Sequence, residues 1–290
     1  IKGPLAAQVH GIARLGAERP PGDVYVSAVV QEEVGGLGAR LLAEALRDRV
    51  GLVVVGEPSS NELRRGHRGR TELVVHVRGR SVHASVPERG ANPLYVLASF
   101  LQRLPTLDMA RHGELGQSSV APTLLRTDQT SANVTPGEVW LTLDWRNVPG
   151  ESAEEVQAKV ELLLQASLFT DVSGEVRLEQ KEQVSFTGYG RVVRADHPAY
   201  SLPADHPAVR AAEQVLSQAL GRDIPTRLWR FATDGGHFAR AGMTVIGFGP
   251  GDEGVVHTVN EHISLQEWEE AIDANERLAR EWPARVEGGP

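Results

Sequence analysis

The sequence predicts an α/β fold, in which a parallel-rich sheet flanked by helices carries an inserted ferredoxin-like α+β domain. Near both ends of the chain, apolar β-branched runs alternate with segments of helical spacing, which is typical of a sheet covered by helices. The middle of the chain instead has the order β-α-β-β-α-β, as in ferredoxin-like domains. The length of 290 residues also exceeds one typical domain. We therefore expect one domain made of residues 1–68 and 183–290, and a second, inserted domain made of residues 69–182.

The first domain is expected to alternate helices with short buried strands. Apolar residues at helical spacing predict helices over residues 4–15, 39–50, 208–220 and 265–281. Apolar runs bounded by turn residues predict strands over residues 24–30, 51–55, 226–229 and 243–248. The run at 24–30 is apolar enough for a strand that is buried on both faces.

The inserted domain is expected to be an antiparallel sheet with two helices on one face. Its strands are predicted over residues 71–77, 118–126, 138–145 and 175–179. Its helices are predicted over residues 92–104 and 151–166. Residues 64–68, which hold three arginines and His67, are expected to form a solvated basic hinge before this domain.

Composition excludes several classes of function. The net charge of −8 and the pI of about 5.7 give no indication of binding to nucleic acid or to an anionic membrane. Because the chain has no cysteine, disulfides and thiolate metal sites are excluded, and any metal must be bound by His, Asp and Glu. No apolar run is long enough to span a bilayer, so a cytoplasmic protein is expected.

Acidic residues and a histidine follow three of the expected strands. Glu32 and Glu33 come after the first strand, Glu57 follows the second, and His257 lies beyond the last. The carboxyl ends of parallel strands meet at one edge of a sheet, where ligands bind. Adjacent carboxylates repel each other unless a cation, a shared proton or water relieves them, although a solvated acidic turn before a helix is an alternative. Carboxylates and imidazole without sulfur suit zinc, manganese or cobalt.

Several motifs resemble the M20 metallopeptidases, in the order seen in that family. They cover nearly the whole chain and comprise Ile1–Ala7, Gln31–Gly35, Val55–Ser59, Gly79–Pro87 and Gly249–His262. The resemblance implies a zinc- or cobalt-dependent hydrolase of amide bonds in amino-acid metabolism. The branch it resembles most deacylates N-acyl amino acids, such as acetylornithine or acetyllysine. A carboxypeptidase or dipeptidase, and a non-catalytic binding relative on the same fold, are the alternatives.

The resemblance assigns a role to each residue at the sheet edge. Glu32 would be the general base, Glu33 and His257 would bind one metal, and Glu57 would bind the other. His83 looks like the histidine that dimers of this family project into the partner's site to polarise the scissile carbonyl. An exposed loop histidine is the alternative for His83. The inserted domain would form the homodimer by pairing edge strands.

Further residues look like substrate contacts of the family. Asn133 and Arg146 would bind the substrate, Arg146 by gripping a carboxylate, and a surface salt bridge is the alternative for Arg146. Gly249 and Gly251 would let the backbone approach the substrate, although a simple turn explains them equally well. Asp234 is expected to be a helix N-cap rather than a metal ligand.

One departure from the family concerns the metal site. The family's His-x-Asp motif and bridging Asp lie upstream of the Lys2-Gly3 motif, and the bridging residue would fall immediately before Ile1. With these residues in the full-length protein, two divalent metals are expected, as zinc or alternatively cobalt or manganese. Without them, we expect the hydrolase to be inactive.

Overall fold

The computed structural model describes residues 1–16, 20 and 22–287, which form two compact units. The first unit contains residues 1–68 and 200–290, and the second contains residues 69–199. The second boundary thus lies after Ala199, whereas the sequence places it after Glu182. The difference arises because the segment that follows residue 182 completes a hairpin and then adds a short strand to the sheet of the second unit.

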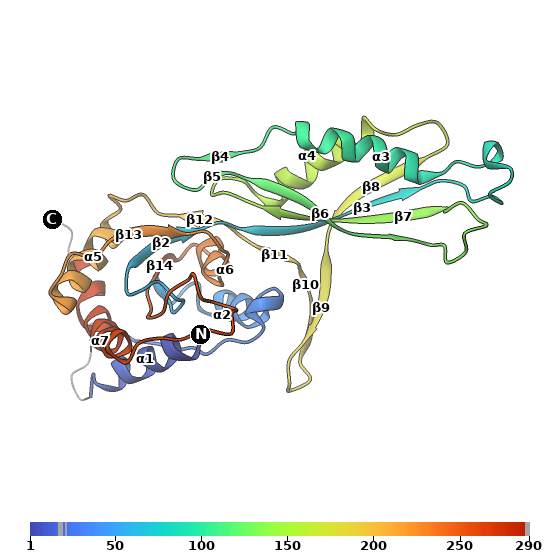
Figure 1. The fold of residues 1–290 in the computed structure, drawn as a ribbon. Helices are drawn as coiled ribbons and strands as arrows, with labels where there is room; N and C mark the ends of the chain where they lie inside the picture. The colour runs from blue at the N-terminus through green and yellow to red at the C-terminus, as the bar shows by residue number, and fades with distance from the viewer. Residues whose placement is uncertain (17–19, 21, 288–290) are drawn as a thin grey trace. The chain divides into compact units, whose positions relative to one another are not determined.

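The first unit is a mixed sheet with helices packed against it (Figure 1). Its strands are β1 (Leu52–Val55), β2 (Leu63–His67), β12 (Tyr200–Ser201), β13 (Thr226–Trp229) and β14 (Thr244–Gly247). Its helices are α1 (Lys2–Ala13), η1 (Glu32–Val34), α2 (Leu37–Leu46), α5 (Pro207–Leu220), α6 (Gly235–Arg240) and α7 (Leu265–Glu287). The strand order is β1-β14-β2-β12, with β13 also paired to β2. The pairs β1–β14 and β13–β2 are parallel, and β14–β2 and β12–β2 are antiparallel.

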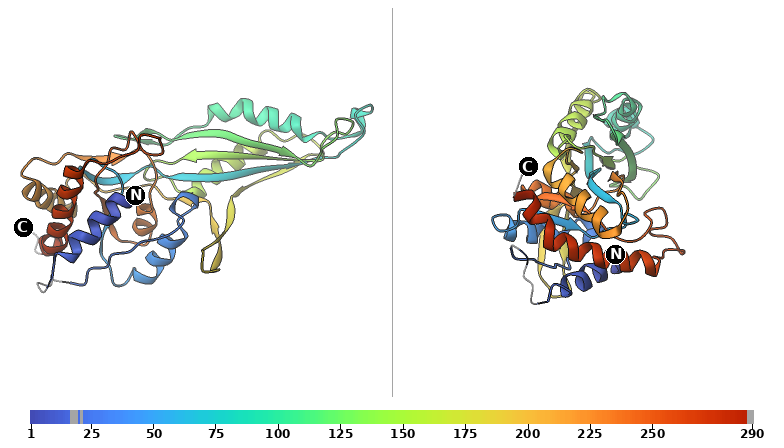
Figure 2. Two further views of the ribbon diagram at one scale, coloured as in Figure 1. Left: turned by 60° about the horizontal axis from the view of Figure 1, so that its bottom comes forward. Right: turned by 90° about the vertical axis from the view of Figure 1, so that its left-hand side faces the viewer.

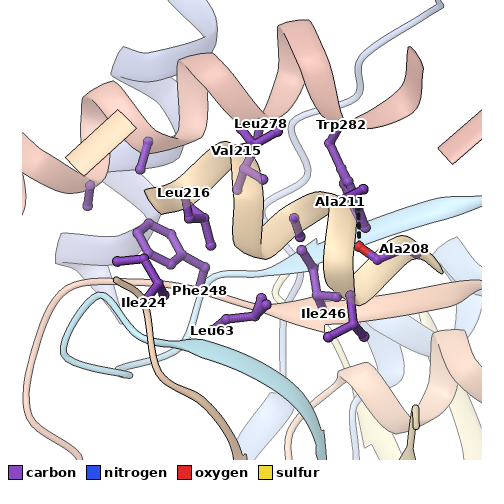
Figure 3. Packing of buried hydrophobic residues seen from close by; sticks show 14 of the residues in the cluster. Leu63, Ala208, Ala211, Val215, Leu216, Ile224, Ile246, Phe248, Leu278 and Trp282 are labelled. Carbon is purple, nitrogen blue, oxygen red and sulfur yellow. Dashed lines mark hydrogen bonds between the residues drawn. The ribbon is translucent and has the colours of Figure 1, made fainter. Parts of the chain in front are cut away.

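The main core of this unit lies between α5, α7 and the sheet (Figure 3). Ile246 and Phe248 from β14 and the residue after it meet Val215 and Leu216 of α5, and all four are fully buried. Burying each such side chain contributes about 1.5–3 kcal/mol. The indole of Trp282 is buried as well, and its Nε1 donates to the Ala208 carbonyl at 2.8 Å. Helix α1 lies beside α7 (Figure 2). These contacts hold the sheet edge that carries the candidate site.

The expected strand over residues 24–30 is not formed. This segment is exposed and has no strand partner among the residues that the structure describes. An apolar run becomes a strand only where a neighbour supplies backbone hydrogen bonds. Residues 24–29 and β1 both line one cavity instead of pairing.

The prediction of a solvated basic hinge is also wrong, because residues 63–67 form β2 inside the sheet. Arg64 and Arg65 are 3% and 4% exposed, and His67 is fully buried. The Arg64 guanidinium donates to Glu62 at 2.8 Å, and Arg65 donates to the Leu202 carbonyl at 2.7 Å. Buried charges are tolerated where such partners satisfy them.

The second unit has the expected ferredoxin-like arrangement. Its strands β3 (Arg70–Arg78), β6 (Ser119–Thr127), β7 (Glu138–Arg146) and β8 (Ser173–Leu178) form an antiparallel sheet in the order β6-β7-β3-β8. Helices α3 (Pro93–Arg103) and α4 (Ala153–Gln165) cover one face of it (Figure 1). Alternate strand residues such as Leu73, Val75 and Leu143 meet Val96 and Phe100 of α3 in the core, so the other face is left to polar side chains.

Short elements complete the second unit. They are η2 (Pro87–Arg89), η3 (Leu104–Thr106), β4 (Arg111–His112), β5 (Gly116–Gln117), β9 (Gln180–Val184), β10 (Gly190–Arg194) and β11 (Asp196–His197). Strands β9 and β10 pair only with each other among the described strands, and β11 pairs with the start of β3.

Candidate metal centre and substrate-binding residues

The acid pair lies in η1, a single turn that the surrounding backbone shapes. Gln31 before the turn has a φ of 64°, and Gly35 and Gly36 after it have φ of 128° and 70°. Glycine adopts such positive φ values without steric cost. Within the turn, Glu32 is half-buried whereas the Glu33 side chain is 71% exposed. The two neighbouring acids therefore lie in different environments.

Glu33 and His257 come together. Their Oε1 and Nε2 atoms lie 3.4 Å apart, and His257 has a φ of 61°. Two ligands of one tetrahedral zinc ion, each about 2.1 Å from the metal, are separated by about 3.4 Å. The donor set of one carboxylate and one imidazole thus fits a shared divalent cation.

Glu57 and the loop after β14 lie at the same sheet edge, because β1 and β14 are parallel neighbours. The Ser59 amide donates to the Gly249 carbonyl at 3.1 Å, which links the two loops directly. A Cβ on Gly249 would lie 2.7 Å from the Glu57 carbonyl oxygen, and Gly251 has a φ of 106°. Both glycines are therefore required by the turn itself.

Three carboxylates near this edge hold their protons more tightly than usual. Burial, with the negative charge of Glu33, raises the pKa of Glu32 to about 7, and His257 offsets part of this. Burial, with the charge of Glu32, raises the pKa of Glu57 to about 8. Burial, again with Glu32, raises the pKa of Asp234 to about 7. Such a group of mutually repelling carboxylates is relieved by a cation.

Asp234 occupies the N-cap position of α6, as expected, but its side chain makes no capping hydrogen bond. It is 6% exposed, and its Oδ1 atom has no hydrogen-bond partner among the described residues. A Cβ on Gly36 would lie 2.5 Å from this atom and 2.7 Å from Nε2 of the buried His237. The second glycine of the Glu-Glu-Val-Gly-Gly run thus lets the turn pass against Asp234 and His237.

A cavity of about 620 Å³ opens beside the acids. Glu32, Glu57 and Asp234 line its polar part, and residues 24–29 together with β1 line its apolar part. Small-molecule sites have this order of size and combine an apolar lining with a few polar groups.

In the second unit, His83 and Asn133 lie next to each other. His83 forms an antiparallel bridge with Val134, and the Ala84 amide donates to the Asn133 carbonyl at 2.7 Å. Both residues are exposed. The Ser85 amide donates to Nδ1 of His83 at 3.2 Å, which places the proton of a neutral ring on Nε2.

Arg146 ends β7 in the second unit, with its side chain 46% exposed. Its Nε donates to Asp144 Oδ1 at 2.6 Å, and Nη2 donates to Oδ2 at 3.3 Å. Arg146 therefore forms the salt bridge that was the alternative to substrate binding. Its partner, Asp144, lies two residues away on the same strand. Asp144 was not singled out by the sequence, although its spacing of two residues on a strand puts it on the same face as Arg146.

The described residues contain no helix with the length and apolar character needed to cross a membrane. Together, the mixed sheet, the antiparallel domain and the acid-histidine edge are those of a two-unit metallohydrolase fold. The model of peptidase family M20/M25/M40 matches residues 1–281, so the chain belongs to this family.

Known relatives are consistent with this assignment. Acetylornithine deacetylase of Myxococcus xanthus is 29% identical over 272 residues, covering 92% of this chain and 66% of that protein. Succinyl-diaminopimelate desuccinylase of Alkalilimnicola ehrlichii is 28% identical over 279 residues, covering 91% and 68%. The chain thus spans about two thirds of the length of these relatives. Among solved structures, aminopeptidase PepT of Bacillus cereus shares the fold, with a TM-score of 0.71 at 18% identity, covering 97% of this chain and 70% of that one.

Proposed function

We propose that the protein is a metal-dependent amide hydrolase that removes the acyl group from an N-acyl amino acid. The observation that carries this proposal is the 3.4 Å separation of Glu33 Oε1 and His257 Nε2, the spacing of two ligands on one ion. The pKa of Glu32 lies at about 7 in the adjacent position, where a general base is most effective near neutral pH.

Glu33 and His257 would hold one divalent ion, and Glu57 would hold a second. Zinc, or alternatively cobalt or manganese, suits these oxygen and nitrogen donors. The ions would supply Lewis-acid polarisation and lower the pKa of a bound water. The second ion needs further ligands, for which the family resemblance implies a His-x-Asp motif and a bridging aspartate outside the 290 residues.

Glu32 accepts the proton of the attacking water and returns it to the leaving amine. Its half-buried position supports this role, because a carboxylate with a pKa of about 7 both takes up and releases a proton at neutral pH. Glu33, which is exposed and lies 3.4 Å from His257, would bind the metal instead.

Substrate recognition falls to the second unit and the glycine loop. Arg146 would bind the α-carboxylate of the substrate, and Asn133 would donate to it from the turn next to His83. His83 would polarise the scissile carbonyl, and its Nε2 proton supports this role. For Gly249 and Gly251, the turn geometry already accounts for glycine, and a substrate contact is an additional proposal.

We propose that the active form is a homodimer, with His83 acting in the partner's site. Strand β6 ends the sheet, and its outer edge has no neighbouring strand within the described part of the chain. It exposes Leu124 and Leu125, which are 68% and 55% accessible. Exposed apolar edge strands are normally covered, and a second copy would do so.

The names of the relatives favour deacylation, since one is a deacetylase and the other a desuccinylase. A carboxypeptidase or dipeptidase on the same scaffold is the second candidate, and a non-catalytic binding protein is the third. The ligand spacing of Glu33 and His257 speaks against the third.

The test is a substrate panel with zinc or cobalt added to the full-length protein. We expect hydrolysis of N-acetylornithine in preference to unblocked dipeptides. A preference for dipeptides would select the second candidate, and no turnover together with no bound metal would contradict the proposal.

A further inference from the structure

A row of alternating charges crosses the polar face of the sheet in the second unit and ends at Arg146. Asp144 accepts from Nε of Arg146 at 2.6 Å and from Nε of Arg70 at 2.7 Å. Arg70 also contacts Glu72 at 3.0 Å, and Glu72 contacts Lys181 at 2.7 Å. The two carboxylates are the least exposed members, with Asp144 at 14% and Glu72 at 10%.

The strand register explains why the row exists. Asp144 of β7 lies directly opposite Glu72 of β3, and like charges in such cross-strand pairs repel each other. Arg70 is placed two residues before Glu72, on the same face, and bridges both carboxylates. At the two ends of the row, Arg146 forms an ion pair with Asp144 and Lys181 forms one with Glu72.

Asp144 accepts hydrogen bonds from one edge of the Arg146 guanidinium. Two bonds, from Nε and Nη2 to the two carboxylate oxygens, fix the plane of the group as well as its position. An exposed arginine otherwise loses rotamer entropy when a ligand immobilises it. Because Arg146 is already held while 46% of its side chain stays exposed, that loss is reduced before a ligand arrives.

We propose that Asp144 is a positioning residue, which orients Arg146 for the carboxylate of the substrate. This inference rests on the proposed function of Arg146. Asp144 itself does not contact the substrate in this account.

Asp144 also has an effect that would weaken binding, because its negative charge repels an anionic ligand. The repulsion is outweighed by the two arginines that share Asp144, which leave the trio with a net positive charge. Without Asp144, two guanidinium groups would lie close together with no anion between them, and Arg146 would turn away.

The experiment measures binding to the full chain by calorimetry, for N-acetylornithine and for the corresponding carboxamide, in which a neutral amide replaces the carboxylate. Wild type, Asp144→Asn and Glu175→Gln are compared. Glu175→Gln is the matched control, because it also removes one negative charge from an ion pair on this sheet, but Glu175 pairs with Arg78 and His76 outside the row. Asp144→Asn should weaken carboxylate binding about tenfold, which corresponds to 1.4 kcal/mol, and leave carboxamide binding unchanged. The control should bind both ligands as wild type does.

A second readout does not depend on ligand. The Nε–Hε resonance of Arg146 in an NMR spectrum should be resolved and slowly exchanging in wild type, and averaged in Asp144→Asn. Asp144→Glu, which keeps the charge, should restore part of the ordering.

Unchanged or tighter carboxylate binding by Asp144→Asn would overturn the positioning role while leaving the role of Arg146 intact. Equal binding of the carboxylate and the carboxamide by wild type would instead remove the proposed role of Arg146, and the inference with it. If Asp144→Asn does not fold, Asp144→Glu decides: wild-type affinity for both ligands with an averaged Arg146 resonance would contradict the inference.

Discussion

Glu33 of η1 and His257 of the loop after β14 face each other, with 3.4 Å between a carboxylate oxygen and an imidazole nitrogen. The His257 amide donates to Glu261 Oε2 at 3.0 Å, which holds the backbone of His257 in its left-handed conformation. The pair is therefore set at a ligand spacing by the chain itself, and the remaining acids are arranged around it.

The first prediction separates the base from the ligands. Glu32→Gln keeps the shape of the side chain but cannot accept a proton, so turnover should fall by at least about 10²-fold. Zinc content, measured by elemental analysis, should stay at the wild-type level. Retained turnover, or a parallel loss of zinc, would assign Glu32 a different role.

The second prediction concerns pH and stability. Burial raises the pKa of Glu57 from 4.5 to about 8, so the folded state holds a proton that the unfolded chain releases in this range. A raised pKa of this kind makes the free energy of unfolding fall as pH rises, by up to about 1.4 kcal/mol per pH unit for one proton.

Glu57→Gln removes this titration. The variant should therefore gain stability relative to wild type between about pH 5 and about pH 8 in metal-free urea unfolding. A difference between the two proteins that does not change with pH would contradict the pKa shift.

The third prediction tests the packing behind the site. A Cβ on Gly247 at the end of β14 would lie 2.1 Å from the buried ring of Trp229. Gly247→Ala should destabilise the protein by at least about 1–3 kcal/mol, as other overpacked cores do. A Cβ on Gly51, just before β1, would have no atom of the described residues within 4 Å apart from its chain neighbours, so Gly51→Ala is the control and should be neutral or slightly stabilising. Equal unfolding free energies of the two variants would show that β14 can move away from Trp229.

The fourth prediction concerns the proposed homodimer. Leu124→Asp places a charge on the exposed edge strand β6 and should convert the dimer to a monomer in analytical ultracentrifugation. Leu162 is also exposed, at 73%, but lies on α4, so Leu162→Asp should leave the dimer intact. A wild-type monomer, or dissociation by both substitutions, would argue against pairing through β6.

Periodicity predicted most of the fold because most segments agree with their surroundings. The β7 strand alternates core and surface residues, and the α4 helix begins with Ser152 and Glu155 in a reciprocal capping box. Such local signals require no knowledge of distant neighbours.

The predictions that failed concern segments whose structure depends on distant neighbours. Residues 24–30 have the composition of a strand but lack a pairing partner among the described residues, whereas Leu63–His67 has the composition of a hinge but is paired on both sides. The buried arginines of β2 depend on Glu62 and the Leu202 carbonyl, and the contact with Leu202 links segments far apart in the chain. Sequence patterns do not reveal partners of this kind.

In the candidate site, too, the sequence predicts some features and the fold determines the others. The sequence places Glu33, Glu57 and His257 at strand ends, and the structure brings Glu33 and His257 together. The surroundings that shift the pKa of Glu32, and the row of charges that holds Arg146, arise from side chains whose proximity depends on the fold.

Zinc binding by equilibrium dialysis tests the central proposal most directly. Wild type should retain zinc, and Glu33→Gln and His257→Ala should each weaken its affinity at least about tenfold. His262→Ala serves as the control, because His262 is exposed on the same loop and its Nδ1 lies 2.6 Å from the Asn260 carbonyl oxygen. The account predicts wild-type affinity for His262→Ala. Wild-type zinc affinity in both Glu33→Gln and His257→Ala would contradict the account.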